Sequence, residues 1–126
     1  LVDGSSQLYD GLSALLEKGE TLKAPIYGTL LQKRNYTFGY FGLTEHALLV
    51  SLLQGDSKEI KGHGRIPFSS IQQAKVRKSL IPLQYLIRLD LTDGGMIKFR
   101  ASQKVYGFAT QKENLDIFLG NIKTCI

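Results

Sequence analysis

Few side chains in this 126-residue chain could perform catalysis or bind a metal ion. The only histidines are His46 and His63, and the single cysteine, Cys125, is remote from both in the sequence. A structural metal site requires several such ligands at defined spacings, so we predict no metal site. We interpret His46 as a solvated residue of a hairpin turn and His63 as a solvated residue of a loop.

The motifs of the common catalytic sites are also missing. Nucleophilic catalysis needs an activated Ser, Cys or Thr beside a base, and the chain contains no Gly-x-Ser-x-Gly motif. Gly62-His63-Gly64 lacks both the strand–loop–helix setting and the following Lys-Ser/Thr of a phosphate-binding loop. The acidic residues are scattered over turns and helix ends rather than paired for acid–base catalysis. We therefore expect a protein that is not an enzyme and that uses no cofactor.

The basic residues point instead to anion binding. Residues 1–20 carry a net charge of −3, whereas residues 58–104 hold ten Lys and Arg against three acids, a net charge of +7. Such asymmetry is typical of proteins with an anionic partner, although an ordinary solvated face has the same composition. One candidate site is the predicted turn with Lys33 and Arg34. The second candidate site is a basic surface of Lys75, Arg77 and Lys78, and we expect Arg88, Lys98 and Arg100 to lie near it.

The segment Tyr36–Leu53 is apolar on both faces of a predicted hairpin. Closing the turn at Glu45-His46 pairs Leu43 with Leu48 on the inner face, which Phe41 and Val50 share. The opposite face is our candidate interface, and it consists of Tyr36, Phe38, Tyr40, Leu49 and Leu53. Such a row is too apolar to remain in water as one patch. The N-terminal helix, the C-terminal helix or another subunit must cover it.

Amphipathic helices are predicted at both ends of the chain. Over Ser5–Lys18, leucines recur at the helical period and form one apolar stripe, and Gly19 ends the helix. Near the C-terminus, Thr110 and Glu113 form a capping box before apolar residues at helical spacing. We expect that helix to span Thr110–Thr124.

Between the helices, alternating apolar and polar residues predict short strands. The first is Glu20–Gln32, with Leu22, Ala24 and Ile26 on one face. Pro25 cannot donate a ladder hydrogen bond, so this strand must lie at an edge or contain a bulge.

The last two predicted strands are joined by a three-residue loop, Asp93-Gly94-Gly95, in which glycine supplies a positive φ. This register places Asp90 opposite Lys98, which is a favourable pair. It also places Arg88 opposite Arg100, which is unfavourable unless an anion, an acidic residue or solvent relieves it.

About residues 20–123 contain, in order, the strings GETLKAPIYGTL, FGLTEHALLV, IPFSSIQQAKV and LIRLDLTDGGMIKFRA, and they end in a predicted helix. This pattern resembles that of the bacterial pleckstrin-homology-like (PH-like) domains, most of them uncharacterised. It implies a mainly β fold: a partly open barrel of about seven antiparallel strands in two roughly orthogonal sheets, capped by the C-terminal helix. Residues 1–19 would be a helical extension and residues 20–126 the barrel domain. In this family some bacterial relatives are thought to self-assemble, and eukaryotic relatives bind phosphoinositides or peptides.

We predict a non-catalytic binding module that interacts with protein, including copies of itself, through the candidate interface. The alternative is peripheral binding to anionic lipid headgroups through the basic residues. Basic residues interleaved with Tyr and Phe can also stack nucleic-acid bases, but no RNP-like string is present, so nucleic acid is a less favoured partner. The single cysteine excludes an internal disulfide and suits a reducing cytosol. We expect a cytoplasmic protein, or one at the membrane surface under the lipid alternative.

Overall fold

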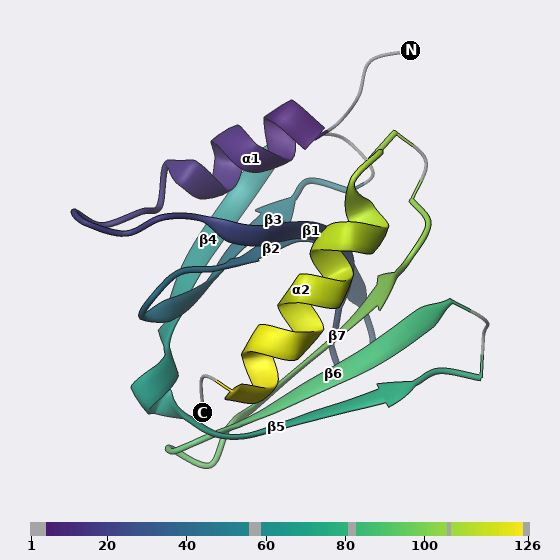
Figure 1. Ribbon diagram of the computed structural model, residues 1–126. Helices are drawn as coiled ribbons and strands as arrows, with labels where there is room; N and C mark the ends of the chain where they lie inside the picture. Colours follow the sequence, from purple (N-terminus) through teal and green to yellow (C-terminus); the bar gives the residue numbers. More distant parts are fainter. Residues whose placement is uncertain (1–4, 56–58, 81–82, 106, 125–126) are drawn as a thin grey trace.

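A computed structural model describes residues 5–55, 59–80, 83–105 and 107–124 (Figure 1). Within these residues, seven antiparallel strands form one sheet in the order β4-β3-β2-β1-β7-β6-β5. The strands are β1 Lys23–Leu31, β2 Tyr36–Leu43, β3 Ala47–Leu53, β4 Ile60–Pro67, β5 Ile71–Lys78, β6 Gln84–Leu91 and β7 Met96–Ser102. The helices are α1 Ser5–Ser13 and α2 Gln111–Thr124, and a 3-10 turn, η1 Phe68–Ser70, connects β4 to β5. None of the described helices is long and apolar enough to cross a membrane.

Strand β1 connects the two halves of the sheet. It pairs with β2 as far as Leu31 opposite Tyr36, but it pairs with β7 only through Thr29 opposite Arg100 and Leu30 opposite Phe99. Figure 1 shows β1–β4 and β5–β7 on two sides of the molecule, with α2 lying between them. The predicted mainly β fold of seven antiparallel strands with a C-terminal helix and an additional N-terminal helix is confirmed. The prediction of two separate sheets was wrong, because β1 pairs with both β2 and β7 and joins all seven strands into one sheet.

A bulge interrupts β1 at Pro25. The register shifts between Lys23 and Ile26, and Ala24 has a positive φ of 51°. Because β1 lies in the middle of the sheet, the bulge is the correct one of the two predicted explanations for Pro25. The bulge also places Leu22 in a different apolar cluster from Ala24 and Ile26, so the prediction that these three share one face was wrong.

The barrel core is built on the predicted inner face of the central hairpin. Leu43 lies opposite Leu48 and Phe41 opposite Val50, as predicted, and all four residues are buried. The Phe41 ring stacks on Phe99 of β7 with centroids 4.4 Å apart. Helix α2 completes this core with its buried residues Leu115, Phe118 and Ile122.

Helix α2 is fixed to the barrel at its first residue. Buried Gln111 donates from Nε2 to the carbonyls of Tyr27 (2.8 Å) and Ser102 (3.0 Å), and its Oε1 accepts from the amide of Tyr27 (3.0 Å). Two of these bonds go to backbone groups of Tyr27 in β1 and the third goes to the carbonyl of Ser102 in β7, so they tie α2 to both strands. The start of α2 directly after Thr110 agrees with the predicted boundary.

The predicted register of β6 and β7 was wrong, because the loop between them begins one residue earlier than predicted. The loop is Thr92-Asp93-Gly94, with the Leu91 amide donating to the Gly95 carbonyl (2.8 Å) and Gly94 at φ 89°. The Asp93 carboxylate accepts from the Gly95 amide (2.8 Å), which stabilises this earlier turn. Arg88 therefore faces Lys98 rather than Arg100, and Asp90 faces Met96 rather than Lys98. Since the pairing shifts by two residues, the inside and outside faces remain as predicted.

Candidate functional site

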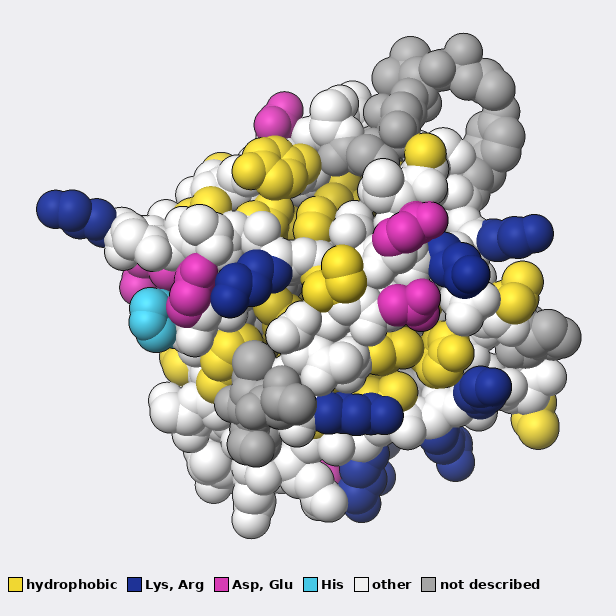
Figure 2. Space-filling model, viewed as in Figure 1, with side chains coloured by type: hydrophobic (Ala, Val, Ile, Leu, Met, Phe, Trp, Pro, Cys, Tyr) yellow, Lys and Arg dark blue, Asp and Glu magenta, His cyan; other side chains and the backbone are white. Residues whose placement is uncertain are grey.

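The outer face of β5, β6 and β7 collects five cations in two rows across the strands. Lys75, Arg88 and Lys98 are in register in one row, and Arg77, Leu86 and Arg100 are in register in the next. We call this surface the basic outer face, and it consists of Lys75, Arg77, Arg88, Lys98 and Arg100. Figure 2 shows Lys and Arg side chains gathered in the lower right part of the molecule, over β5 and β6.

Four of these cations line a shallow hollow of about 280 Å³ together with Leu86. The one acidic residue of the three strands is Asp90, which accepts a hydrogen bond from Arg88 Nε at 3.0 Å. Like charges directly opposite one another on neighbouring strands destabilise a sheet. The Lys75–Arg88–Lys98 row is therefore unfavourable for folding, and the Asp90 carboxylate offsets part of its positive charge.

The other predicted anion-binding residues lie elsewhere. Lys78 is in register with Tyr85 at the end of β5 and lines a separate hollow with Ser79, so it does not join Lys75 and Arg77 on the basic outer face. Lys33 and Arg34 are exposed in the turn after β1 and do not line the hollow.

Helix α1 covers most of the candidate interface. Tyr40, Leu49 and Leu53 pack against Leu8 and Leu12 of α1 and are almost completely buried. These three residues are therefore not available on the surface of the chain. Of the three elements that could cover the candidate interface, the N-terminal helix does so. The helix is shorter than the predicted Ser5–Lys18, since it ends at Ser13 and continues in turns.

Two residues of the candidate interface extend beyond the helix. Tyr36 is 63% exposed, and Phe38 is half-buried, with its ring 6.0 Å from that of Tyr27. Together with Leu53 and Lys61 they line an open hollow of about 490 Å³.

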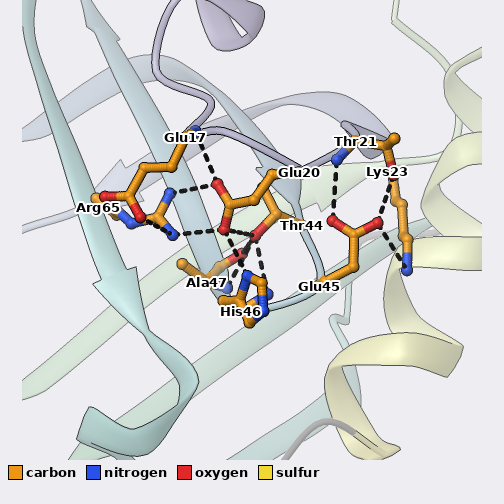
Figure 3. A network of polar contacts seen from close by, with 9 residues as sticks. All are labelled: Glu17, Glu20, Thr21, Lys23, Thr44, Glu45, His46, Ala47 and Arg65. Carbon is orange, nitrogen blue, oxygen red and sulfur yellow. Dashed lines mark hydrogen bonds and ion pairs between the residues drawn. The ribbon is translucent and has the colours of Figure 1, made fainter.

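A polar cluster, drawn in Figure 3, holds the segment between α1 and β1 against the central hairpin. At its centre is Glu20, whose side chain is only 1% exposed. Arg65 of β4 donates to both carboxylate oxygens, at 2.8 and 2.5 Å. Thr44 Oγ1 donates to the same carboxylate at 3.0 Å, and His46 Nδ1 lies 2.9 Å from it. The Glu17 amide donates a further bond at 3.0 Å.

These contacts decide the protonation state of Glu20. Hydrogen bonds from Arg65, and more weakly from the Glu17 amide, His46 and Thr44, hold the pKa of Glu20 well below its usual range, against the opposing effect of burial. Nearby, the Thr21 hydroxyl and amide bind the Glu45 carboxylate at 2.6 and 2.9 Å and lower the pKa of Glu45 to about 2. Both carboxylates are charged at neutral pH and accept hydrogen bonds from protein groups. The cluster therefore fixes the segment that follows α1, and with it the position of the helix.

The sequence pattern does not predict this cluster. Glu20 is one of several scattered acidic residues, and its partner Arg65 lies 45 residues away in the sequence. His46 was interpreted as solvated; its side chain is 69% exposed, but Nδ1 reaches Glu20. His63 is exposed as predicted but lies in β4, opposite Ser51, rather than in a loop.

No group of three or more His, Cys, Asp or Glu among the described residues could hold a metal ion. Cys125 lies outside the described residues.

Comparison with known proteins relates the chain to others only through its fold. No family model and no curated protein matches it. Among solved structures, the hSac2 domain of the human phosphoinositide phosphatase Sac2 matches with a TM-score of 0.63 and 12% identity, over 96% of this chain and 79% of that one. The C-terminal domain of an unknown protein from Leishmania infantum matches with a TM-score of 0.61 and 16% identity, over 94% and 96%.

A third match defines the fold class. The pleckstrin homology domain from Shewanella amazonensis SB2B has a TM-score of 0.52 and 18% identity, and the alignment covers 92% of each chain. The chain therefore has a PH-like fold, as its sequence resemblance implied. The predicted bacterial origin remains a prediction. At these identities the comparisons establish the fold alone, and a fold by itself does not determine a function.

Proposed function

We propose that this chain is a PH-like binding module that docks on anionic membrane surfaces through the basic outer face. The observation that carries the proposal is the Lys75–Arg88–Lys98 row, in which three cations face one another across adjacent strands. A row of like charges is unfavourable in the free protein and becomes favourable beside a layer of negative headgroups.

The size of the expected attraction is sufficient for reversible binding. A basic residue near an anionic bilayer contributes about 1 kcal/mol, so five cations supply roughly 5 kcal/mol before the costs of association. Salt screens this attraction over a Debye length of about 8 Å at physiological ionic strength. Binding should therefore be weak, reversible and sensitive to salt.

Sedimentation with lipid vesicles tests the proposal. The full chain should bind vesicles that contain phosphatidylserine at low salt, and its affinity for them should fall as the salt concentration rises. It should not bind neutral phosphatidylcholine vesicles. The double variant Lys75→Glu/Lys98→Glu should bind at least about 30-fold more weakly, since two contributions of about 1 kcal/mol are removed.

The matched control is Lys18→Glu/Lys112→Glu, which changes the net charge equally at two exposed lysines outside this face. It should retain most of the binding. Equal losses in both double variants would mean that only net charge matters, and no binding to anionic vesicles at low salt would remove the proposal.

A second candidate function is self-association through the uncovered end of the candidate interface. The supporting observation is the exposed Tyr36 beside Phe38 in the open hollow of about 490 Å³. Light scattering across a concentration series should then show association that Tyr36→Ser weakens. A monomer at high concentration would rule this function out.

A further inference from the structure

Strand β4 ends the sheet on one side, and its outer edge has no partner strand among the described residues. It is the first strand in the order β4-β3-β2-β1-β7-β6-β5 and pairs only with β3 (Figure 1). Its burial agrees with an edge position, since Ile60, Lys61, His63 and Pro67 are exposed. The edge of a sheet carries a row of backbone amides and carbonyls that can pair with an extended segment of another chain.

The hydrogen-bonding pattern shows which backbone groups of β4 point outward. The Phe68 amide donates to the His46 carbonyl at 2.9 Å, and the β3–β4 register continues from this pair without interruption to the bulge near the start of β4. Bonded pairs alternate in an antiparallel ladder, so every second residue of β4 counted back from Phe68 bonds to β3. The amides and carbonyls of His63 and Arg65 lie between these pairs and therefore point away from the sheet. Pro67 is in the same outward set, where a residue without an amide hydrogen is tolerated.

Two glycines on the inner side of this edge have no explanation within the fold. Gly62 lies opposite Leu52 and Gly64 opposite Val50, so both face the side of the barrel core. Neither has a positive φ, and a Cβ atom added to either would have no atom within 4 Å. Glycine weakens a strand, and inside a strand it often marks a place that another backbone approaches closely. Their neighbours on this face, Leu52 and Ile66, are apolar and only partly buried.

The opposite side of the same edge is basic. Lys61 lines the open hollow beside Tyr36, and His63 and Arg65 lie on the face that α1 covers, opposite two residues of β3. Like charges facing one another are unfavourable in a sheet, so the β4 strand of a second copy, with the same cations, is a poor partner. A segment with acidic side chains on this face would be complementary in charge.

We propose that the outer edge of β4 binds an extended, acidic segment of a partner protein as an additional strand. Apolar side chains of the segment would lie over Gly62 and Gly64, and acidic side chains would lie beside Lys61 and His63. The segment would therefore alternate apolar and acidic residues, because successive side chains of a strand point to opposite faces. This surface shares no residue with the basic outer face, so the inference is independent of the proposed membrane binding.

Nuclear magnetic resonance with a synthetic peptide tests the proposal. The peptide Glu-Val-Glu-Val-Glu-Val-Glu, added at millimolar concentration to the isotope-labelled full chain, should shift the amide resonances of His63 and Arg65 and slow their exchange with solvent. The Gly64 amide, which already bonds to β3, should exchange at an unchanged rate. The same peptide with every backbone amide methylated cannot donate ladder hydrogen bonds and should not bind.

Three results would overturn strand addition. The peptide could shift no amide of β4, it could shift only residues of the basic outer face, or its methylated form could bind equally well. None of these results bears on the sedimentation with lipid vesicles, so the two proposals fail separately.

A double variant tests the role of the two glycines. Valine favours strands and has room at both positions, so Gly62→Val/Gly64→Val should lose no stability in urea denaturation. Its affinity for the peptide should nevertheless fall at least about tenfold, because the valine side chains occupy the space that the apolar side chains of the peptide need. Undiminished binding by a folded double variant would contradict the proposal.

A pair of charge variants tests the acidic character of the partner. Lys61→Glu should weaken binding of the peptide about fivefold, because it places like charges side by side. Lys112→Glu, at an exposed position of α2, makes the same change in net charge and should leave the affinity unchanged. Equal losses in the two variants would mean that the peptide responds to net charge alone, and would overturn the proposed placement of its acidic side chains.

Discussion

Arg65 on β4 clamps the buried carboxylate of Glu20 with two hydrogen bonds, and so joins the segment after α1 to the far edge of the sheet. This pair lies at one end of the surface that α1 covers. The carboxylate side chain is 1% exposed and the guanidinium 24% exposed, so the pair is shielded from water much better than an ordinary surface ion pair. Breaking a shielded pair leaves one charge without its partner, which costs more than the pair itself contributes.

Replacing Glu20 by Gln should therefore destabilise the protein strongly. The amide cannot accept both Arg65 bonds, and the partly buried guanidinium keeps only the exposed Glu17 carboxylate, 3.3 Å away, as a counter-charge. We expect the free energy of unfolding to fall by at least about 2 kcal/mol. Urea denaturation measures this change. Glu17→Gln is the control: its side chain is 67% exposed, 3.3 Å from Arg65, and its loss should cost no more than about 0.5 kcal/mol.

Stability should decrease in acid because of the same carboxylates. The pKa of Glu20 and that of Glu45 are both lowered on folding from the ordinary value of 4.5, the latter to about 2. A lowered pKa contributes stability that is complete above about pH 4.5 and is lost as the pH falls through the folded-state value. Urea midpoints between pH 7 and pH 2.5 should show this loss.

In this titration the difference in the free energy of unfolding between the wild-type protein and Glu20→Gln should shrink as the pH falls, since protonation of Glu20 removes the same charge as the substitution. Asp116→Asn, at an exposed position of α2, should leave the shape of the wild-type curve unchanged. Parallel curves for the wild-type protein and Glu20→Gln would contradict the assignment of the acid sensitivity to Glu20.

A charge placed beneath α1 should expose the apolar row that the helix covers. Leu12 is completely buried against this row, so Leu12→Asp should release the helix and uncover Tyr40, Leu49 and Leu53. We expect binding of a hydrophobic dye and association that grows with concentration, measured by light scattering. Gln7→Asp, on the exposed side of the same helix, should do neither. A monomeric Leu12→Asp protein that binds no dye would show that α1 is not needed as a cover.

The junction of the two halves of the sheet should not tolerate a side chain at Gly28. A Cβ atom there would lie 2.8 Å from the Arg100 carbonyl oxygen and 3.2 Å from the Phe41 ring, and the carbonyl belongs to the backbone of β7. We expect Gly28→Ala to cost about 1–3 kcal/mol, measured by urea denaturation. Gly64→Ala has no atom within 4 Å of its new Cβ and should change stability by less than about 0.5 kcal/mol. Equal effects of the two substitutions would contradict this account of Gly28.

Local patterns determined much of the fold. The predicted turn at Glu45-His46 gave the pairing of Leu43 with Leu48, because the position and length of the turn determine the register of a hairpin. In β6, the alternation of apolar and polar residues predicted the inner face but not the exact partners. There the choice between two three-residue loops depended on one hydrogen bond from the Gly95 amide to Asp93, which the alternation does not reveal.

The candidate site was predictable in part for the same reason. Lys75, Arg77, Arg88, Lys98 and Arg100 alternate with core residues along their strands, so the pattern predicted that they point outward. The pairing of β5 with β6 and of β6 with β7 brings them together in two rows. Three other relationships were found in the structure alone. Arg88 faces Lys98 because of the hydrogen bond inside the β6–β7 loop. That α1 rather than another subunit covers Tyr40, and that Glu20 meets Arg65, depends on contacts between distant segments, and a contact across 45 residues leaves no periodic signal along the chain.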